Sequence, residues 1–275
     1  MQDLLSPSHP LLFMHLPKTA GGSILAVVES SFQPPDLYLF YHDDPSRAAD
    51  EIAEAGPARL IYGHFVYGLH QTLDVPPRYC CFLRNPVDRT ISHFYHLKTA
   101  DPGPYGDLAR GFDSVGDFVE RSGYWAASNL MCRMITGLGD GRVPPDDLLA
   151  GWAKTLLRDH FPIFGISEFL PLSLEVLRRT IGLSLDSFPV VNKGSYRLRE
   201  LSQRDIDLVV SANQADLDLY GFAVRRFLDT ILPETMCGGP AGMANTLTAV
   251  SPASFEPLSC PIRVGSGSGE SALPG

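Results

Sequence analysis

The residues best suited to chemistry are Lys18 and the small residues after it, in the stretch Leu11–Ser31, LLFMHLPKTAGGSILAVVESS. A short apolar run, Leu11–Met14, is followed by Pro17, and a second apolar series begins at Ile24. The two lengths predict a strand, a loop and a buried helix. The loop then lies at a helix N-terminus, where unpaired amides carry roughly half a positive charge and Lys18 adds a full one. This arrangement is typical of a site for phosphate or another tetrahedral anion.

This loop is not a Walker A loop, because Lys18 precedes the glycines instead of following them. Taken by itself, it also fits an ordinary turn with an exposed lysine. The sequence HLPKTAGGS resembles the 5′-phosphosulfate loop of sulfotransferases that use 3′-phosphoadenosine 5′-phosphosulfate (PAPS), and above all the carbohydrate branch of the heparan sulfate 2-O and 6-O type. Gly22 stands where that family usually has threonine, so one hydroxyl contact is missing. The resemblance implies cofactor binding by Pro17, Lys18, Thr19, Ala20, Gly21, Gly22 and Ser23.

A second polar group follows the apolar run Tyr79–Leu83. Asn85 and the proline after it are a favourable cap and first residue for a helix. Arg84 carries a planar, permanent charge suited to bidentate phosphate binding, although such an arginine is more often a surface ion-pair partner. Arg89 and Ser92 are three residues apart, so we expect them to share a helix face. The stretch resembles the 3′-phosphate motif of the same family, which implies that Arg84 and Ser92 bind the 3′-phosphate of PAPS.

His64 directly follows the predicted strand Arg59–Tyr62 and one glycine. An imidazole with an unperturbed pKa near 6.5 is suited to accept a proton at neutral pH, although a lone histidine is more often structural. The segment GHFVYG resembles the family segment that supplies the catalytic base, which implies that role for His64. His70, His93 and His96 are weaker candidates; the alternative for the latter two is that they solvate the outer face of their helix.

Near the C-terminal end of the resemblance, which spans roughly Pro10 to Leu228, the segment NKGS resembles the family segment that closes over the cofactor. Without the resemblance it is a polar turn. The resemblance implies cofactor contacts from Asn192, Lys193 and Ser195.

Four further residues are weaker candidates. Glu168 is expected to be structural or to orient the acceptor. Arg133 is either a contact to an acidic acceptor or a solvated helix arginine. Tyr124 and Trp125 either stack on a sugar ring or pack in the core, and core packing is favoured.

Apolar strands alternate with helices along the chain, and polar residues follow the strands. This order predicts an α/β fold, a single P-loop-like domain with a doubly wound parallel sheet flanked by helices and a ligand at the strand C-termini. The weakly periodic middle, Asp101–Arg142, begins with a Gly/Pro-rich loop and is typical of a substrate-binding insertion. Further expected strands are Leu37–Tyr41 and Pro162–Ile166, and further expected helices are Ser46–Ala55, Val115–Arg121, Trp125–Ile135, Asp146–Asp159, Pro171–Ile181 and a long stretch from Ser202 to Leu232.

The composition after Leu232 changes to Gly, Pro, Ser and Thr. We therefore expect a folded domain over residues 1–232 and a disordered tail over 233–275. The net charge of −9 and the lack of a basic block argue against a nucleic acid partner, and an anionic cofactor would need a local basic cluster.

Five cysteines show no metal-ligand spacing and no disulfide pattern, so no metal is expected and a reducing compartment is favoured. No signal peptide or apolar run of about 18 residues is present. Since many animal relatives carry a Golgi membrane anchor, this absence favours a cytoplasmic protein, either bacterial or a trimmed form.

The expected function is transfer of a sulfuryl group from PAPS to a hydroxyl of an acceptor, with a carbohydrate favoured. Two alternatives stay open. One is a P-loop-like kinase that uses ATP, and the other is a protein of the same fold that binds nucleotide or a partner without turnover. The acceptor and the oligomeric state are not predicted by the sequence.

Overall fold

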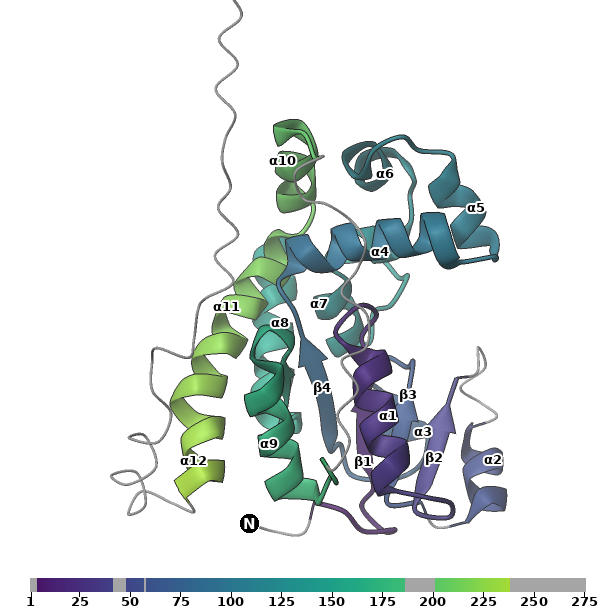
Figure 1. The fold of residues 1–275 in the computed structure, drawn as a ribbon, viewed down its shortest axis with the longest axis vertical. Coiled ribbons are helices and arrows are strands. Elements are labelled where there is room, and N and C mark those ends of the chain that lie inside the picture. Colours follow the sequence, from purple (N-terminus) through teal and green to yellow (C-terminus); the bar gives the residue numbers. More distant parts are fainter. Residues whose placement is uncertain (1–3, 42–47, 57, 186–200, 238–275) are drawn as a thin grey trace, which may run out of the picture.

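Five parallel strands form one sheet at the centre of the chain (Figure 1). The computed structural model describes residues 4–41, 48–56, 58–185 and 201–237. The order across the sheet is β2-β3-β1-β4-β5. The predicted α/β fold with a parallel sheet flanked by helices is therefore confirmed. The strands are β1 (Leu11–Met14), β2 (Leu37–Phe40), β3 (Leu60–Gly63), β4 (Tyr79–Leu83) and β5 (Gly165–Ile166).

The middle strands are apolar because both faces of the sheet are covered. Every residue of β1, β3 and β4 is buried, including Cys80 and Cys81 in β4. β1 pairs with β3 on one side and with β4 on the other. The chain thus changes direction across the sheet at β1, and a ligand crevice is expected at the C-terminal ends of β1 and β4.

Most strand bounds agree with the prediction, and β5 does not. It has two residues instead of the five expected over Pro162–Ile166. Gly165 packs against the ring of Phe82, and a Cβ placed there would lie 2.4 Å from that ring. The strand is limited to the two residues that pair with Phe82 and Leu83 of β4, a limit that an apolar sequence pattern does not show.

The helices cover both faces of the sheet and its C-terminal edge (Figure 1). Their bounds are α1 (Gly21–Ser31), α2 (Ala48–Ala55), α3 (Leu69–Thr72), α4 (Pro86–Ala100), α5 (Pro104–Arg110), α6 (Val115–Arg121), α7 (Leu130–Ile135), α8 (Asp146–His160), α9 (Leu170–Ile181), α10 (Gln203–Ser211), α11 (Gln214–Arg226) and α12 (Leu232–Cys237). Short 3-10 turns cover Trp125–Ala127 and Ser167–Phe169, and a π-helical turn covers Phe227–Ile231.

Helix α4 crosses above the C-terminal edge of the sheet, and α5, α6 and α10 lie beyond it (Figure 1). The cap at its start is the predicted one, because the Asn85 side chain accepts hydrogen bonds from the amides of Val87 (3.0 Å) and Asp88 (3.3 Å). A second apolar cluster joins α4 to α5, α6 and α10, with Phe94 and Phe118 among its buried residues. This helical layer is thus held by a core of its own over the sheet edge.

Three predictions of local structure were wrong. The Gly/Pro-rich loop is helical from Pro104 onward, because proline is favourable in a first helical turn. The helix expected over Trp125–Ile135 is interrupted at Asn129, whose φ of 48° is left-handed. The long C-terminal helix breaks at Asn213, whose buried side chain accepts a hydrogen bond from the Asn129 amide (3.0 Å).

The predicted capping box of Ser202 and Asp205 at the start of α10 is confirmed. The C-terminal helices continue to Cys237, five residues beyond the end predicted at Leu232, and the remainder of the predicted tail lies outside the described residues. Among the described residues, no helix combines the length and the apolar character needed to cross a membrane.

Candidate functional site

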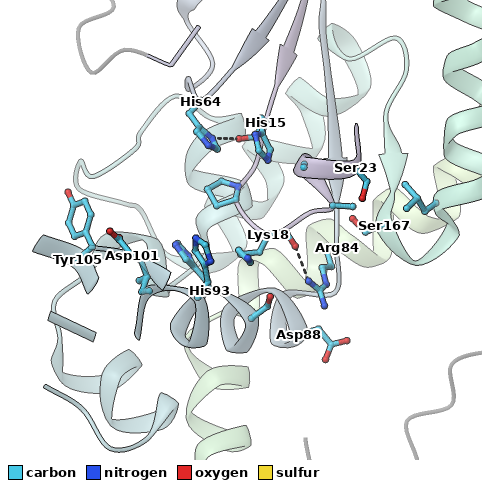
Figure 2. A pocket seen from close by; sticks show the side chains of 18 of the residues that line it. His15, Lys18, Ser23, His64, Arg84, Asp88, His93, Asp101, Tyr105 and Ser167 are labelled. Atoms are coloured by element: carbon cyan, nitrogen blue, oxygen red, sulfur yellow. Dashed lines mark hydrogen bonds between the residues drawn. The ribbon is translucent and has the colours of Figure 1, made fainter. Parts of the chain in front are cut away.

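A cavity of about 870 Å³ lies where the C-terminal ends of the strands meet helix α4 (Figure 2). Its walls come from the loop after β1, the residues that follow β3, β4 and β5, one face of α4, and the segments around Tyr105 and Tyr124. The predicted ligand loops after β1, β3 and β4 therefore converge on one site.

The loop between β1 and α1 has an unusual backbone. Lys18 and Ala20 have φ values of 69° and 67°, in the left-handed region that non-glycine residues seldom adopt. Ala20 is the N-cap of α1, and no side chain caps this helix end. Alternating backbone conformations of this kind turn successive amides toward one point and favour anions. Of the residues predicted to bind cofactor here, those that line the cavity are Pro17, Lys18, Ala20, Gly21, Gly22 and Ser23.

Thr19 is the member of the predicted loop whose side chain does not reach the cavity. It is buried, and its hydroxyl donates a hydrogen bond to the Leu16 carbonyl (2.8 Å). The threonine hydroxyl therefore stabilises the backbone conformation of the loop from its buried side.

Lys18 and Arg84 form what we call the cationic end of the cavity. The Arg84 guanidinium donates a hydrogen bond to the Lys18 carbonyl (3.0 Å), which ties the loop after β1 to the end of β4 (Figure 2). Burial and the Arg84 charge lower the pKa of Lys18. Lys18 forms no ion pair with a carboxylate in the described part of the chain. Two neighbouring positive charges at a helix N-terminus are an electrostatic arrangement that an anion would relieve.

Ser92 lines the cavity as predicted, but Arg89 does not share its face. Arg89 is fully buried, and its guanidinium donates to the Ala126 carbonyl (3.2 Å) and the Thr90 hydroxyl (2.7 Å). Burial lowers the pKa of Arg89 to about 10, and the charge of buried Asp216 opposes that shift. Arg89 thus anchors α4 in the core, and Asp88, one turn before Ser92, lies on the cavity face instead.

His64 lies on the cavity wall beside His15. Its Nδ1 donates a hydrogen bond to the His15 carbonyl (2.8 Å, Figure 2), so the neutral ring has its lone pair on Nε2. The two imidazoles stack with centroids 4.3 Å apart. Burial lowers the pKa of His64, and the bond to His15 partly opposes that shift. A histidine held neutral with a free Nε2 is suited to act as a general base.

His15 is a site residue for which the sequence analysis proposed no role. Burial lowers its pKa to about 3, with further lowering from His64 and Lys18, so its ring is neutral. A Cβ on Gly21 would lie 1.5 Å from His15 Nε2, so a glycine at this position is what allows the ring to pack against the start of α1. The signal was present in the sequence, because His15 directly follows β1.

His93 and His96 both line the cavity, so the alternative that they solvate the outer face of α4 was wrong. His93 is buried, and burial and the Arg89 charge lower its pKa well below the usual value. His96 is exposed within the cavity. His70 lies elsewhere, hydrogen-bonded through Nδ1 to the Tyr79 hydroxyl (2.8 Å).

The remaining candidates divide between the cavity and the scaffold. Glu168 lines the cavity and accepts a hydrogen bond from the Asn85 amide (2.8 Å), which fixes the turn after β4. Both expectations for Arg133 were wrong. Its guanidinium donates hydrogen bonds to the loop carbonyls of Ser128, Gly139 and Gly141, so it stabilises the loop after α7. Tyr124 lines the cavity, whereas Trp125 packs on the core.

Asn192, Lys193 and Ser195 lie outside the described residues. Two residues of the cavity wall, Asp101 and Tyr105, were absent from the sequence-based candidates. They belong to the segment expected to be a loop: Asp101 is the C-cap of α4, and Tyr105 lies in the first turn of α5.

Comparisons with known proteins give matches among solved structures. No protein-family model matches this chain, and no curated protein matches it. Among solved structures, the crystal structure of mouse sulfotransferase SULT7A1 complexed with PAP is similar, with a TM-score of 0.42 and 12% sequence identity. The match covers 88% of this chain and 91% of the mouse chain.

Proposed function

We propose that this protein transfers a sulfuryl group from PAPS to a hydroxyl of an acceptor, with a carbohydrate as the favoured acceptor. The single observation that carries the proposal is the convergence of Lys18, Arg84 and His64 on one cavity at the C-terminal edge of the sheet. Two cationic residues suit a ligand with two separate phosphates, and a neutral imidazole nearby suits deprotonation of a hydroxyl.

The residues of the cationic end fit a nucleotide that carries a 5′-phosphosulfate and a 3′-phosphate. The helix N-terminus and Lys18 hold the 5′ group, and Lys18 stabilises the negative charge that develops on the departing phosphate oxygen. Arg84 and Ser92 hold the 3′-phosphate. Asn192, Lys193 and Ser195, which lie outside the described residues, complete the cofactor contacts in this proposal. No metal is required for this chemistry.

His64 acts as the general base. Its Nε2 takes the proton of the acceptor hydroxyl while the hydroxyl oxygen forms a bond to sulfur. The bond between sulfur and the 5′-phosphate oxygen breaks, and adenosine 3′,5′-bisphosphate (PAP) leaves with that electron pair. The hydrogen bond from Nδ1 to the His15 carbonyl leaves the Nε2 lone pair available to accept that proton, and Nδ1–H remains a donor to the same carbonyl in the imidazolium that forms.

The experiment that tests this proposal follows the transferred group. The protein is incubated with PAPS labelled at sulfur, or with ATP labelled at the γ-phosphate, together with hydroxyl acceptors. We expect the label to pass from PAPS to an acceptor with release of PAP. Transfer from ATP would support a kinase instead, and nucleotide binding without transfer from either donor would support a non-catalytic protein of this fold.

A further inference from the structure

The end of the cavity away from Arg84 has a different chemistry. Figure 2 shows Asp101 and Tyr105 beside each other at one end of the cavity and Arg84 at the other, with His93 and Lys18 between them. Tyr124 lines the same end, and its ring centroid is 4.8 Å from that of Tyr105, with an angle of 42° between the rings. We call Asp101, Tyr105 and Tyr124 the aromatic end.

The two tyrosines offer an apolar surface with polar tips. Tyr105 is 48% exposed, whereas Tyr124 is half-buried against His93 and Phe118. Flat aromatic surfaces that border a cavity and carry a hydroxyl are typical of binding sites for ligands that are apolar on one face and polar at the edge.

Asp101 is fixed in place by its own loop. Its Oδ1 accepts a hydrogen bond from the Gly103 amide (2.7 Å), and its carbonyl accepts one from the Arg110 guanidinium (2.9 Å). The second carboxylate oxygen, Oδ2, has no hydrogen-bond partner among the described residues. Asp101 also acts electrostatically on Tyr124 and His96, which places the charge at the cavity wall. A fixed carboxylate oxygen accepts hydrogen bonds from hydroxyl groups.

The basic side chains of the surrounding helices are used elsewhere. Arg110 pairs with Asp107, Lys98 donates to the Phe112 carbonyl, and Arg121 pairs with Asp117. No lysine or arginine from α4, α5 or α6 lines the cavity. Among the described residues, the lysine and the arginine that line the cavity are Lys18 and Arg84, which form its cationic end. Near Asp101, a negatively charged acceptor would meet a like charge, which opposes binding.

We propose that the aromatic end binds the acceptor, and that the acceptor is an uncharged sugar rather than an anionic polysaccharide. The sugar ring packs on Tyr105 and Tyr124, and its hydroxyls donate hydrogen bonds to Asp101. This inference rests on the proposed sulfuryl transfer, and it narrows the acceptor to the class of uncharged sugars.

The test compares acceptors and variants in one transfer assay. The neutral acceptors are lactose, cellobiose and maltose oligosaccharides, and the anionic ones are heparosan and chondroitin. We expect kcat/KM for the best neutral acceptor to be at least about 10-fold higher than for either anionic acceptor. A difference of this size corresponds to the contribution of one well-placed hydrogen bond or contact. Tyr105→Ala and Asp101→Asn should each lower kcat/KM for that acceptor by about 10-fold, through KM. Tyr105→Phe retains the ring and is the matched control.

Binding of PAP, followed by thermal unfolding, separates the two proposals. We expect PAP to stabilise the wild type, Tyr105→Ala and Asp101→Asn equally. Preference for heparosan or chondroitin would overturn the neutral acceptor and leave sulfuryl transfer in place. Unchanged kinetics in both variants would overturn the site at the aromatic end. Absence of PAP binding and of any transfer would overturn the proposed function and this inference with it.

Discussion

The two ends of the cavity are built in different ways. The cationic end is built by the backbone, because Lys18 and Arg84 each follow a strand of the sheet and lie beside a helix N-terminus. The aromatic end is built by side chains from three segments: the end of α4, the start of α5 and the residue before the turn at Trp125–Ala127. We infer that changes at the cationic end will affect every acceptor alike, whereas changes at the aromatic end will depend on which acceptor is used.

The largest expected effect is that of replacing His64, the proposed general base, which acts on the acceptor bound at one end and on the group transferred from the nucleotide at the other. His64→Ala should lower kcat by about 10²–10⁴-fold for all acceptors, because a positioned base contributes that much. Stabilisation by PAP should be retained. His9→Ala, which removes an exposed histidine, is the control. Near-wild-type turnover in His64→Ala would assign the base to another residue.

Lys18→Ala should lower kcat by about 10²–10³-fold, the usual effect of removing one group that stabilises developing charge. The loss should be equal for neutral and anionic acceptors, because Lys18 acts on the nucleotide, and PAP binding should weaken. Lys154→Ala, which removes a lysine paired with Asp218 on α8 and α11, should leave both properties unchanged. A loss confined to one class of acceptor would place Lys18 in the acceptor site.

Gly21→Ala tests the packing that joins the loop to the histidine pair. The added methyl overlaps the His15 ring, so we expect the free energy of unfolding to fall by about 1–3 kcal/mol and the stacked His15–His64 pair to be displaced. Gly151→Ala in α8 is the matched control, because nothing lies within 4 Å of its added Cβ. It should raise the free energy of unfolding by about 0.5–1 kcal/mol. Denaturant titration measures both, and equal stability of the two variants would contradict the packing.

The smallest effects concern pH. His64 must be neutral to act, and its pKa is lowered, so the acid limb of kcat/KM should have its midpoint below 6.5. Because the pKa of His15 is lowered to about 3 in the folded state, the unfolded state binds more protons between about pH 3 and 6.5. The free energy of unfolding should therefore rise with pH across this window, and His15→Gln should flatten the rise. An acid limb at or above 6.5 would contradict the environment described for His64.

The sequence predicted the parts of the molecule that depend on local pattern. The strand over Leu11–Met14, the Asn85 cap and the Ser202 capping box need only neighbouring residues, and all three are present. The residues at the cationic end were found for the same reason, because Lys18 lies in the loop between a strand and a helix and Arg84 directly follows a strand.

The features that the sequence did not predict depend on contacts between distant segments. Arg89 was expected on the cavity face, but its partners, Ala126 and Asp216, are distant in the sequence. The break at Asn129 likewise depends on the side chain of Asn213. At the aromatic end, the sequence predicted a substrate-binding insertion over Asp101–Arg142 and named Tyr124 as a candidate. It did not single out Asp101 or Tyr105, because the contact of Tyr105 with Tyr124 joins two separate segments of the insertion.

The central claim is that the cationic end binds a nucleotide with both a 5′ and a 3′ phosphate. The most direct measurement is thermal unfolding of the protein with PAP, 5′-AMP or ATP, using Arg84→Ala and, as control, the exposed Arg225→Ala. At about 100 times its Kd, a ligand of the native state adds about 2.7 kcal/mol, enough to raise Tm by several degrees. We predict a shift with PAP alone, lost in Arg84→Ala and kept in Arg225→Ala. A shift with ATP instead, or none with any nucleotide, would contradict the account.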